Sequence, residues 1–239
     1  AEALRAIEFA AAAGFERVNV DLMHGLPGQG PEAALADLDT ALGAGVRHLS
    51  WYQLTIEPNT AFHSRPPVLP EGDVLERIED AGFARLRGAG LERYEVSAWA
   101  VPGEESRHNL NYWRFGDYLG VGPGAHGKVT TPDGTVLRTR RTRAPKDWFG
   151  AGQETAPARN AARVPPEVLP EEFMMNALRL TDGVDEALFE AHTGLPVATV
   201  EDCLRALRSE GLLRPERLAT TELGLRFLDR TVAAFLERP

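Results

Sequence analysis

Strand-like and helix-like segments alternate through the first hundred residues, and this alternation limits the possible folds more than any other feature of the chain. Strand-like runs at 17–23, 48–56 and 93–99 are separated by helical patterns at 31–44 and 71–88. This rhythm predicts an α/β fold with βαβ units on a parallel sheet. Such sheets bind ligands in the loops after the carboxyl ends of their strands. The residues that follow each strand are therefore the first site candidates.

The alternation ends after residue 99. A stretch rich in glycine and aromatic residues at 108–129 precedes a Pro-Asp-Gly sequence between apolar runs, which is typical of a hairpin turn. Three parts are expected from composition and periodicity. They are an α/β domain with the Gly/aromatic extension at 1–150, a linker rich in Ala and Pro at 151–169, and a mostly helical, winged-helix-like domain at 170–239.

The charge balance disfavours nucleic acid as a partner. The chain has 26 basic and 35 acidic residues, a formal net charge of −9, whereas phosphate binding needs clustered basic residues. A winged helix can bind DNA, but the expected third helix mixes acidic and basic side chains, so a packing role is favoured. Those side chains are Glu201, Asp202, Arg205, Arg208 and Glu210.

The single cysteine, Cys203, excludes an intramolecular disulfide and any metal centre ligated by cysteines of this chain alone. The apolar run Phe9–Phe15 is too short to span a bilayer and has no basic flank or cleavage site. We therefore expect a soluble, cytoplasmic protein without stable membrane insertion. The first helical pattern, which runs to about Ala13, has no N-cap, so the chain is expected to be a C-terminal fragment that begins inside a domain.

Two acidic residues lie near strand ends. Asp21 precedes a turn built from glycine and proline, and its carboxylate could accept hydrogen bonds from a sugar hydroxyl or an ammonium group. Capping of the following loop is an equal alternative for Asp21. Glu57, in the sequence LTIEPNT, could be catalytic, although a carboxylate in such a turn more often orders its own loop.

The segment His108–Trp113 (HNLNYW) combines an imidazole, two amides and two large aromatic rings. Histidine is the commonest side-chain ligand of metals and haem iron, and flat rings suit a planar ligand. The alternative is an aromatic core anchor with a histidine that satisfies buried carbonyls. The Gly-rich segment 120–127 could approach a flat ligand or phosphate, but close packing of backbones explains its glycines equally well.

Six segments, in order along the chain, are closely similar to the oxygen-independent coproporphyrinogen III oxidase family of radical SAM proteins, and HNLNYW resembles the HemW-type haem chaperone branch of that family. The segments are 18–29, 49–60, 90–100, 107–113, 117–127 and 179–185. The resemblance implies a partial (β/α) barrel that binds a [4Fe–4S] cluster through a CxxxCxxC loop, with S-adenosylmethionine (SAM) on the cluster. This chain has no such loop, so the resemblance implies the C-terminal portion of the barrel.

The resemblance also implies roles for residues in the SAM site. Asp21 would be a polar contact to SAM, Thr55 would lie beside SAM after the next strand, and His126 would lie near the adenine. His24 stands where the family usually has tyrosine, which leaves the shape of this edge of the site open.

On the haem side, His108 would be the ligand of the haem iron, and Tyr112 and Trp113 would pack on the porphyrin. The implied function is a haem chaperone that binds haem and transfers it to haem proteins. The alternative is an oxygen-independent coproporphyrinogen III oxidase of porphyrin biosynthesis. Reductive cleavage of SAM needs a cluster held by cysteine thiolates, so no catalytic residue is assigned here and this chain alone is expected to be inactive. No sequence feature indicates an oligomeric state.

Overall fold

The computed structural model describes residues 2–150 and 161–236. The chain divides into two compact units, Ala1–Ser106 and Arg107–Pro239. The first unit contains the alternating strands and helices, and the second contains the Gly/aromatic segment, a hairpin and the C-terminal helices.

The first unit is built on a four-stranded sheet with the strand order β1-β2-β4-β3. The strands are β1 (Asn19–His24), β2 (His48–Gln53), β3 (Glu92–Arg93) and β4 (Ala98–Ala100). The helices are α1 (Glu2–Ala12), α2 (Pro31–Gly43), α3 (Ala61–Ser64) and α4 (Gly72–Gly88). Strands β1 and β2 are parallel and are joined through α2. The predicted βαβ unit is therefore confirmed, and Pro31 begins α2 at a position where a proline costs no hydrogen bond.

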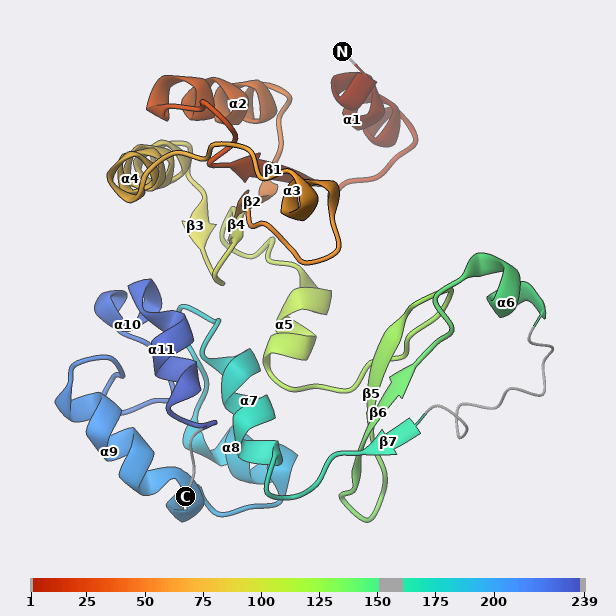
Figure 1. Ribbon diagram of the computed structural model, residues 1–239, viewed down its shortest axis with the longest axis vertical. Helices are drawn as coiled ribbons and strands as arrows, with labels where there is room; N and C mark the ends of the chain where they lie inside the picture. Colours follow the sequence, from red (N-terminus) through yellow and green to blue (C-terminus); the bar gives the residue numbers. More distant parts are fainter. Residues whose placement is uncertain (1, 151–160, 237–239) are drawn as a thin grey trace. The chain divides into compact units, whose positions relative to one another are not determined.

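Helices α2 and α4 pack together and cover one face of this sheet (Figure 1). Side chains alternate between the two faces of a strand, so Leu49 and Trp51 of β2 and Trp99 of β4 share the face that contacts the helices. Leu38 of α2 and Ile78 of α4 complete this core without solvent exposure. The opposite face is left for polar residues.

The third predicted strand, over 93–99, is wrong as a single parallel strand. Its ends form two short strands, β3 and β4, which pair antiparallel to each other, and β4 also pairs antiparallel to β2. Strand β3 keeps the direction expected for a βαβ crossover, while β4 returns between β3 and β2. The guanidinium of Arg93 donates a hydrogen bond to the carbonyl of Val96, and this contact holds the reversal.

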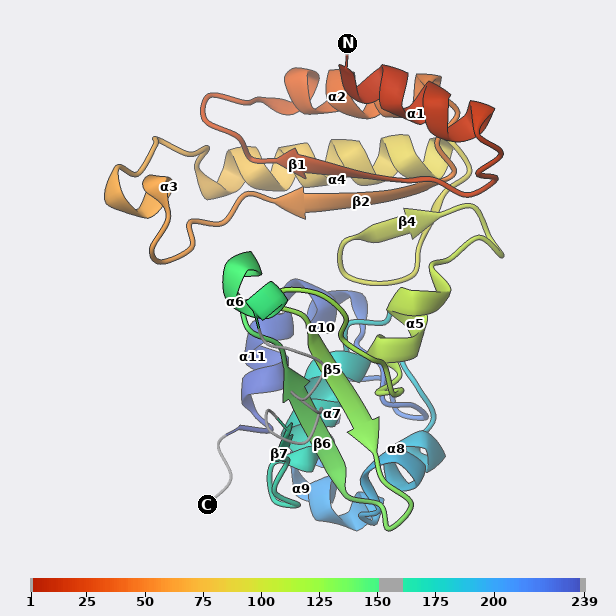
Figure 2. The ribbon, with the colours of Figure 1, turned by 90° about the vertical axis from the view of Figure 1, so that its right-hand side faces the viewer.

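The second unit contains a three-stranded antiparallel sheet and most of the short helices (Figure 2). The strands are β5 (His126–Thr130), β6 (Val136–Arg140) and β7 (Ala161–Arg163). The helices are α5 (Arg107–Trp113), α6 (Pro145–Gly150), α7 (Leu169–Ala177), α8 (Glu186–Thr193), η2 (Val197–Val200), α9 (Glu201–Ser209), α10 (Glu222–Arg226) and α11 (Leu228–Ala233).

The predicted hairpin turn is confirmed between β5 and β6. Asp133 accepts hydrogen bonds from the hydroxyl of Thr131 and the backbone N–H of Thr135. Gly134 follows with a φ of 82°, a left-handed conformation that glycine adopts without strain.

The division of the chain differs from the predicted one. Residues 151–160 of the predicted linker lie outside the described residues, but 161–163 form β7, which pairs with β6, and α7 begins at Leu169. Segments on both sides of residue 150 therefore belong to one sheet, and the two compact units divide at residue 106 instead. Composition signalled a linker because alanine and proline are common in loops, and it carried no information on strand pairing.

The C-terminal helices match the winged-helix-like arrangement that the periodicity predicts. Helices α7, α8 and α9 are followed by a short antiparallel bridge between Leu213 and Thr220, and Leu218 bridges to Val184. Phe173 and Phe189 lie at the centre of the core. None of the helices described here has the length and apolar character needed to cross a membrane.

Two glycines of α4 give a matched stability test. A Cβ on Gly82 would lie 1.9 Å from the ring of Trp51, whereas a Cβ on Gly88 would meet no atom within 4 Å. We expect Gly82→Ala to lower the free energy of unfolding by about 2 kcal/mol through overpacking, and Gly88→Ala to raise it by about 0.5 kcal/mol through helix propensity. Urea unfolding of the two variants measures both values. Equal effects would contradict the tight contact between α4 and β2.

Candidate functional site

The face of the first sheet that points away from α2 and α4 carries polar side chains, which are exposed on β1 and buried on β2. Asn19 and Asp21 of β1 lie opposite His48 and Ser50 of β2 in the strand register. These four residues alternate with the apolar residues that contact α2 and α4, so they share the face away from the helices. Asp21 is exposed within β1, three residues before the strand ends at His24. It is thus a residue of the sheet face rather than of the following loop.

A chain of hydrogen bonds runs across this face to Asp21. The amide nitrogen of Asn19 donates to Asp21 Oδ1 over 2.8 Å, so Asn19 Oδ1 is the acceptor for His48 Nδ1 at 2.7 Å. His48 Nε2 then accepts from the Tyr94 hydroxyl at 2.8 Å. Burial and the neighbouring Arg17 lower the pKa of His48, which favours the neutral ring that this pattern requires. The network fixes the exposed carboxylate of Asp21, which suits a polar ligand group.

The loop after β2 contains Thr55 and Glu57. The Thr55 hydroxyl donates to Glu57 Oε1 over 3.1 Å, and the Glu57 carbonyl accepts from the Thr60 hydroxyl over 2.7 Å. Thr60 in turn caps α3 by accepting from the backbone N–H of His63. Glu57 therefore orders its own loop, which is the alternative to a catalytic role for this carboxylate. Thr55 lies exposed beside it.

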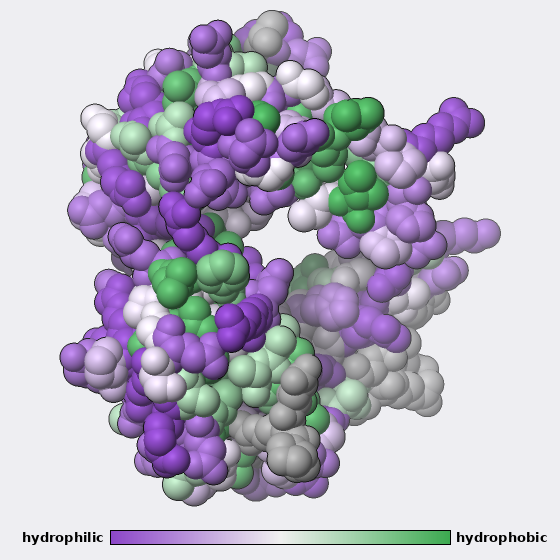
Figure 3. Space-filling view, turned by 60° about the vertical axis from the view of Figure 1, so that its left-hand side comes forward, coloured by the Kyte–Doolittle hydropathy of each residue, from purple (hydrophilic) through white to green (hydrophobic). Residues whose placement is uncertain are grey.

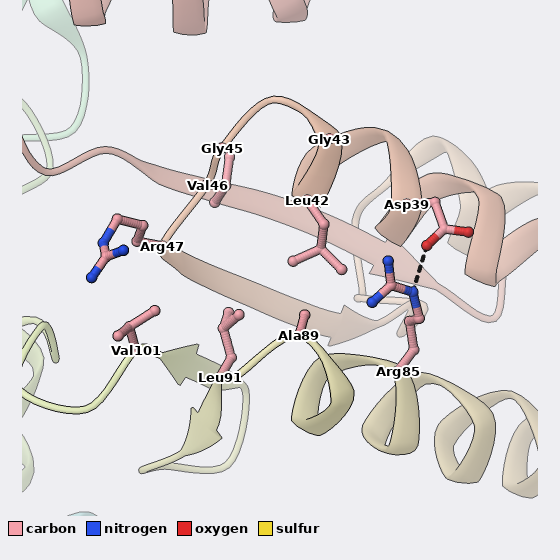
Figure 4. A pocket seen from close by; sticks show the side chains of 10 residues that line it. All are labelled: Asp39, Leu42, Gly43, Gly45, Val46, Arg47, Arg85, Ala89, Leu91 and Val101. Atoms are coloured by element: carbon pink, nitrogen blue, oxygen red, sulfur yellow. Dashed lines mark hydrogen bonds and ion pairs between the residues drawn. The ribbon is translucent and has the colours of Figure 1, made fainter.

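A cavity of about 700 Å³ in the first unit lies away from these residues (Figure 4). It is lined by the C-terminal ends of α2 and α4 and by the start of β2, and an ion pair between Asp39 and Arg85 closes one side at 2.6 Å. None of the predicted site residues lines it. Because it lies at the amino ends of the strands, its position is typical of structural rather than ligand-binding residues.

In the second unit, α5 presents His108 beside two tyrosine rings. The imidazole lies edge-on to Tyr112 at 5.3 Å and to Tyr118 at 6.3 Å between ring centroids. His108 is exposed, and no hydrogen bond to its ring is found among the described residues. The ring nitrogens of His108 are thus available to an external ligand. In the described part of the chain, His108 does not donate to buried carbonyl groups, the role that is the alternative to ligand binding.

Trp113 has a different environment from His108. It packs against the core of the second unit, and the Arg179 guanidinium lies 4.5 Å from its ring centroid. Its indole N–H is buried without a hydrogen-bond partner in this part of the chain. The core-anchor alternative therefore describes Trp113, while Tyr112 links it to the surface through a ring contact of 4.3 Å.

An ion pair between a buried lysine and an exposed aspartate, which sequence reasoning missed, anchors this cluster. Lys128 of β5 is 2% exposed, and its ammonium lies 2.8 Å from Asp117 Oδ1. Asp117 also accepts the backbone N–H of Thr130 at 2.7 Å, and its carbonyl accepts from the side chain of Asn111 in α5 at 2.8 Å. Asp117 therefore connects α5 to β5, and it directly precedes Tyr118 in the chain. The only sequence signal was a lysine inside a strand-like apolar run.

The Gly-rich segment packs closely on the start of β5. A Cβ on Gly120 would lie 2.4 Å from the carbonyl oxygen of His126, so close approach of backbones accounts for this glycine. His126 itself is exposed as the first residue of β5. Leu119 and Val121 are 80% and 83% exposed; Figure 3 shows how apolar side chains reach the surface among hydrophilic ones. Asp21 and Thr55 belong to the first unit and His126 to the second.

The described residues contain no cluster of three or more His, Cys, Asp or Glu side chains that could hold a metal ion. Cys203 lies on α9, and its Sγ donates to the carbonyl of Ala234 at 3.3 Å. One thiol cannot supply the ligands of an iron–sulfur cluster. The chain therefore does not fit a cluster by itself, and no chemistry is derived through one.

Comparison with known proteins gives consistent relatives. Residues 164–227 match the family model "HemN C-terminal domain". The chain is 46% identical to the heme chaperone HemW of Escherichia coli, over 98% of this chain and 62% of that protein. It is 34% identical to the HemW of Mycobacterium tuberculosis, over 95% of this chain and 57% of that protein.

The fold resembles that of a solved structure, the coproporphyrinogen III oxidase HemN of Escherichia coli, described as a radical SAM enzyme. The TM-score is 0.73 at 18% identity, and the match covers 98% of this chain and 58% of that one. The expected α/β fold of the radical SAM family is thus confirmed, although the sheets described here form no closed barrel. The chain spans about three fifths of the length of the curated relatives just named.

Proposed function

We propose that the protein is a haem chaperone that binds haem at α5 and passes it to haem proteins, because residues 164–227 match the HemN C-terminal domain and the chain is 46% identical to the heme chaperone HemW of Escherichia coli. The observation that carries the proposal is the environment of His108. Its imidazole is exposed, free of hydrogen bonds within the described residues, and flanked by Tyr112 and Tyr118.

The chemistry of these side chains suits haem as cargo. A neutral imidazole is a strong axial donor to haem iron. The Tyr112 ring contacts His108. Further along the chain, Leu119 and Val121 expose apolar side chains. These groups suit the flat apolar face of a porphyrin. Trp113 supports the cluster from the core side. An exposed ligand also suits transfer, because an acceptor protein can reach the iron without unfolding of the donor.

We also propose that Asp21 and Thr55 of the first unit contribute to a SAM site, and the role of His126 near the adenine stays a prediction from the resemblance. Support comes from Asp21, whose exposed carboxylate is held by Asn19 and His48. A carboxylate there would accept hydrogen bonds from hydroxyl or ammonium groups of SAM. The cluster that reduces SAM in this family would need cysteines that these 239 residues do not contain. An oxidase activity stays the alternative prediction.

The haem proposal is tested by titrating hemin into the protein and into the variant His108→Ala. We expect the parent to shift the Soret band from that of free hemin, and His108→Ala to lose the shift and bind about tenfold or more weakly, since coordination of the iron is removed. Circular dichroism confirms that the variant is folded, as expected for an exposed helical residue.

His63→Ala is the matched control, because His63 is another exposed imidazole on a short helix, α3. Its spectrum should equal that of the parent. A Soret shift that survives in His108→Ala and disappears in His63→Ala or His126→Ala would refute the assignment of the haem ligand.

A further inference from the structure

One face of the β5–β6 hairpin carries a row of cross-strand residue pairs, here called the ladder. Only some of the positive charges in the ladder form ion pairs with acidic side chains. Side chains two residues apart share a face. From the turn outward, the pairs on this face are Thr130 with Val136, Lys128 with Arg138, and His126 with Arg140. The first pair meets the core through Val136. In the second pair Arg138 reaches Glu172 of α7, whereas His126 and Arg140 of the third pair are exposed.

The cations of the middle pair are neutralised by acidic side chains. Lys128 lies 2.8 Å from Asp117, and Arg138 lies 2.5 Å from Glu172 of α7. Arg140, in the outer pair, is exposed and has no ion pair in the described part of the chain. Among residues 2–150 and 161–236, the ladder therefore ends on a guanidinium that no carboxylate pairs with.

A surface depression of about 450 Å³ lies beside this end of the hairpin, and the described residues that line it include no acid. The lining residues are Arg140, Arg141, Thr142 and Arg143. The Gly-rich segment fixes this stretch, since the backbone N–H of Gly124 donates to the Thr142 carbonyl at 2.8 Å and Arg141 Nε donates to the Gly120 carbonyl at 3.2 Å. Arg140 and Arg143 remain available to a ligand.

The same face connects to the His108 cluster. Arg138 Nη1 donates to the Tyr118 hydroxyl at 3.3 Å, and the Tyr118 ring lies 6.3 Å from His108. Arg140 follows Arg138 on the same face of β6. Arg140 and Arg143 line one depression without an ion pair to any described residue, in a chain of net charge −9. Like charges repel, and an anion would stabilise the two arginines.

We infer that Arg140 and Arg143 form a carboxylate-binding site for the propionate groups of the tetrapyrrole. The inference rests on the proposed haem function and adds to it the residues that recognise the ligand's negative end. Planar guanidinium groups bind carboxylates through paired, charge-assisted hydrogen bonds. His108 would bind the iron while the arginines fix the orientation of the ring.

The test compares hemin with hemin dimethyl ester, in which both propionates are esterified and uncharged. Binding is followed by the Soret band in the parent, Arg140→Gln, Arg143→Gln and the control Arg205→Gln, which removes an exposed arginine of α9. We expect the parent to prefer hemin over the ester by about tenfold or more. Arg140→Gln and Arg143→Gln should reduce that preference by weakening hemin binding only, and Arg205→Gln should leave it unchanged.

Three outcomes would overturn the inference. An unchanged preference in both variants, with the Soret shift still dependent on His108, would remove the propionate site and leave the haem function intact. Equal weakening of hemin and ester would make the arginines structural. Inorganic phosphate that competes with hemin and ester equally would indicate a general anion site. If neither hemin nor its ester shifts the Soret band of the parent, the proposed haem function itself fails.

Discussion

The free energy of unfolding should fall by about 3 kcal/mol as the pH is lowered from 6.5 to 4, through the titration of His24. His24 is 3% exposed and its Nδ1 is buried without a hydrogen-bond partner in the described chain. The ring packs on Trp51 at 4.2 Å between centroids. Burial lowers the pKa of His24 from 6.5 to about 4, because the apolar surroundings disfavour the imidazolium.

The direction of the effect follows from the protons bound in each state. Between pH 6.5 and 4 the unfolded chain takes up a proton at His24 while the folded chain does not, so acid favours unfolding. Stability from the neutral ring is fully present above pH 6.5. His24→Phe keeps an aromatic ring on Trp51 and cannot titrate, so its stability should depend less on pH by about the same 3 kcal/mol.

Urea unfolding at several pH values between 4 and 7 measures this slope. His63→Ala removes an exposed histidine and should keep the slope of the parent. Parallel pH profiles for the parent and His24→Phe would show that the buried ring is not responsible.

The fold of the first unit could be predicted from the sequence wherever the spacing of apolar residues within one segment determines whether that segment is a helix or a strand. Apolar periodicity located α2 and α4, and alternating residues located β1 and β2, because one face of each element must contact the core. The same pattern failed over 93–99, since all three residues of β4 are buried and a buried run does not reveal strand direction. The chain reversal between β3 and β4 is held by the hydrogen bond from the Arg93 guanidinium to the Val96 carbonyl, and the periodicity of apolar residues does not predict this contact.

The candidate site was predictable only where its residues are adjacent in the chain. His108 and Tyr112 are four residues apart and meet on one face of α5. The bonds from Tyr94 to His48 and from His48 to Asn19 join three strands or their ends, and they exist only in one strand register. The spacing of residues along a single sequence does not show which residues of two strands lie opposite each other. Trp113, which the motif predicts to contact haem, is partly buried against the core of the second unit, and the motif does not encode this packing.

The connection between α5 and β5 shows why stability and the proposed function are linked in the second unit. Asn111 lies between His108 and the end of α5, and its amide bonds to the Asp117 carbonyl. Phe115, at a φ of 60°, lies in a left-handed conformation that is costly for a bulky residue. The Lys128 ammonium lies 4.3 Å from the Phe115 ring. The ion pair between Asp117 and the buried Lys128 therefore supports a strained turn that leads to Tyr118, which lies beside His108.

Removing the carboxylate of this pair should lower stability more than removing a carboxylate on the open surface. We expect Asp117→Asn to lower the free energy of unfolding by about 2 kcal/mol, since the Lys128 ammonium is buried while solvent partly screens the Asp117 carboxylate, whose side chain is 43% exposed. Partial burial would raise the pKa of Asp117, but hydrogen bonds from Lys128 and Thr130 prevail and lower it. This contribution is therefore present above about pH 3.9, the pKa of an unfolded Asp, and is lost as the pH falls through the lower folded value.

Asp73→Asn is the matched control, because Asp73 pairs with Arg77 on the surface of α4 with both side chains more than 60% exposed. That pair should contribute at most about 0.5 kcal/mol. The double variant Asp117→Asn/Lys128→Met should regain much of the lost stability, since it removes the buried charge that Asp117→Asn leaves unpaired. Equal losses in Asp117→Asn and Asp73→Asn, or no recovery in the double variant, would show that the strained turn at Phe115 is held by the surrounding core alone.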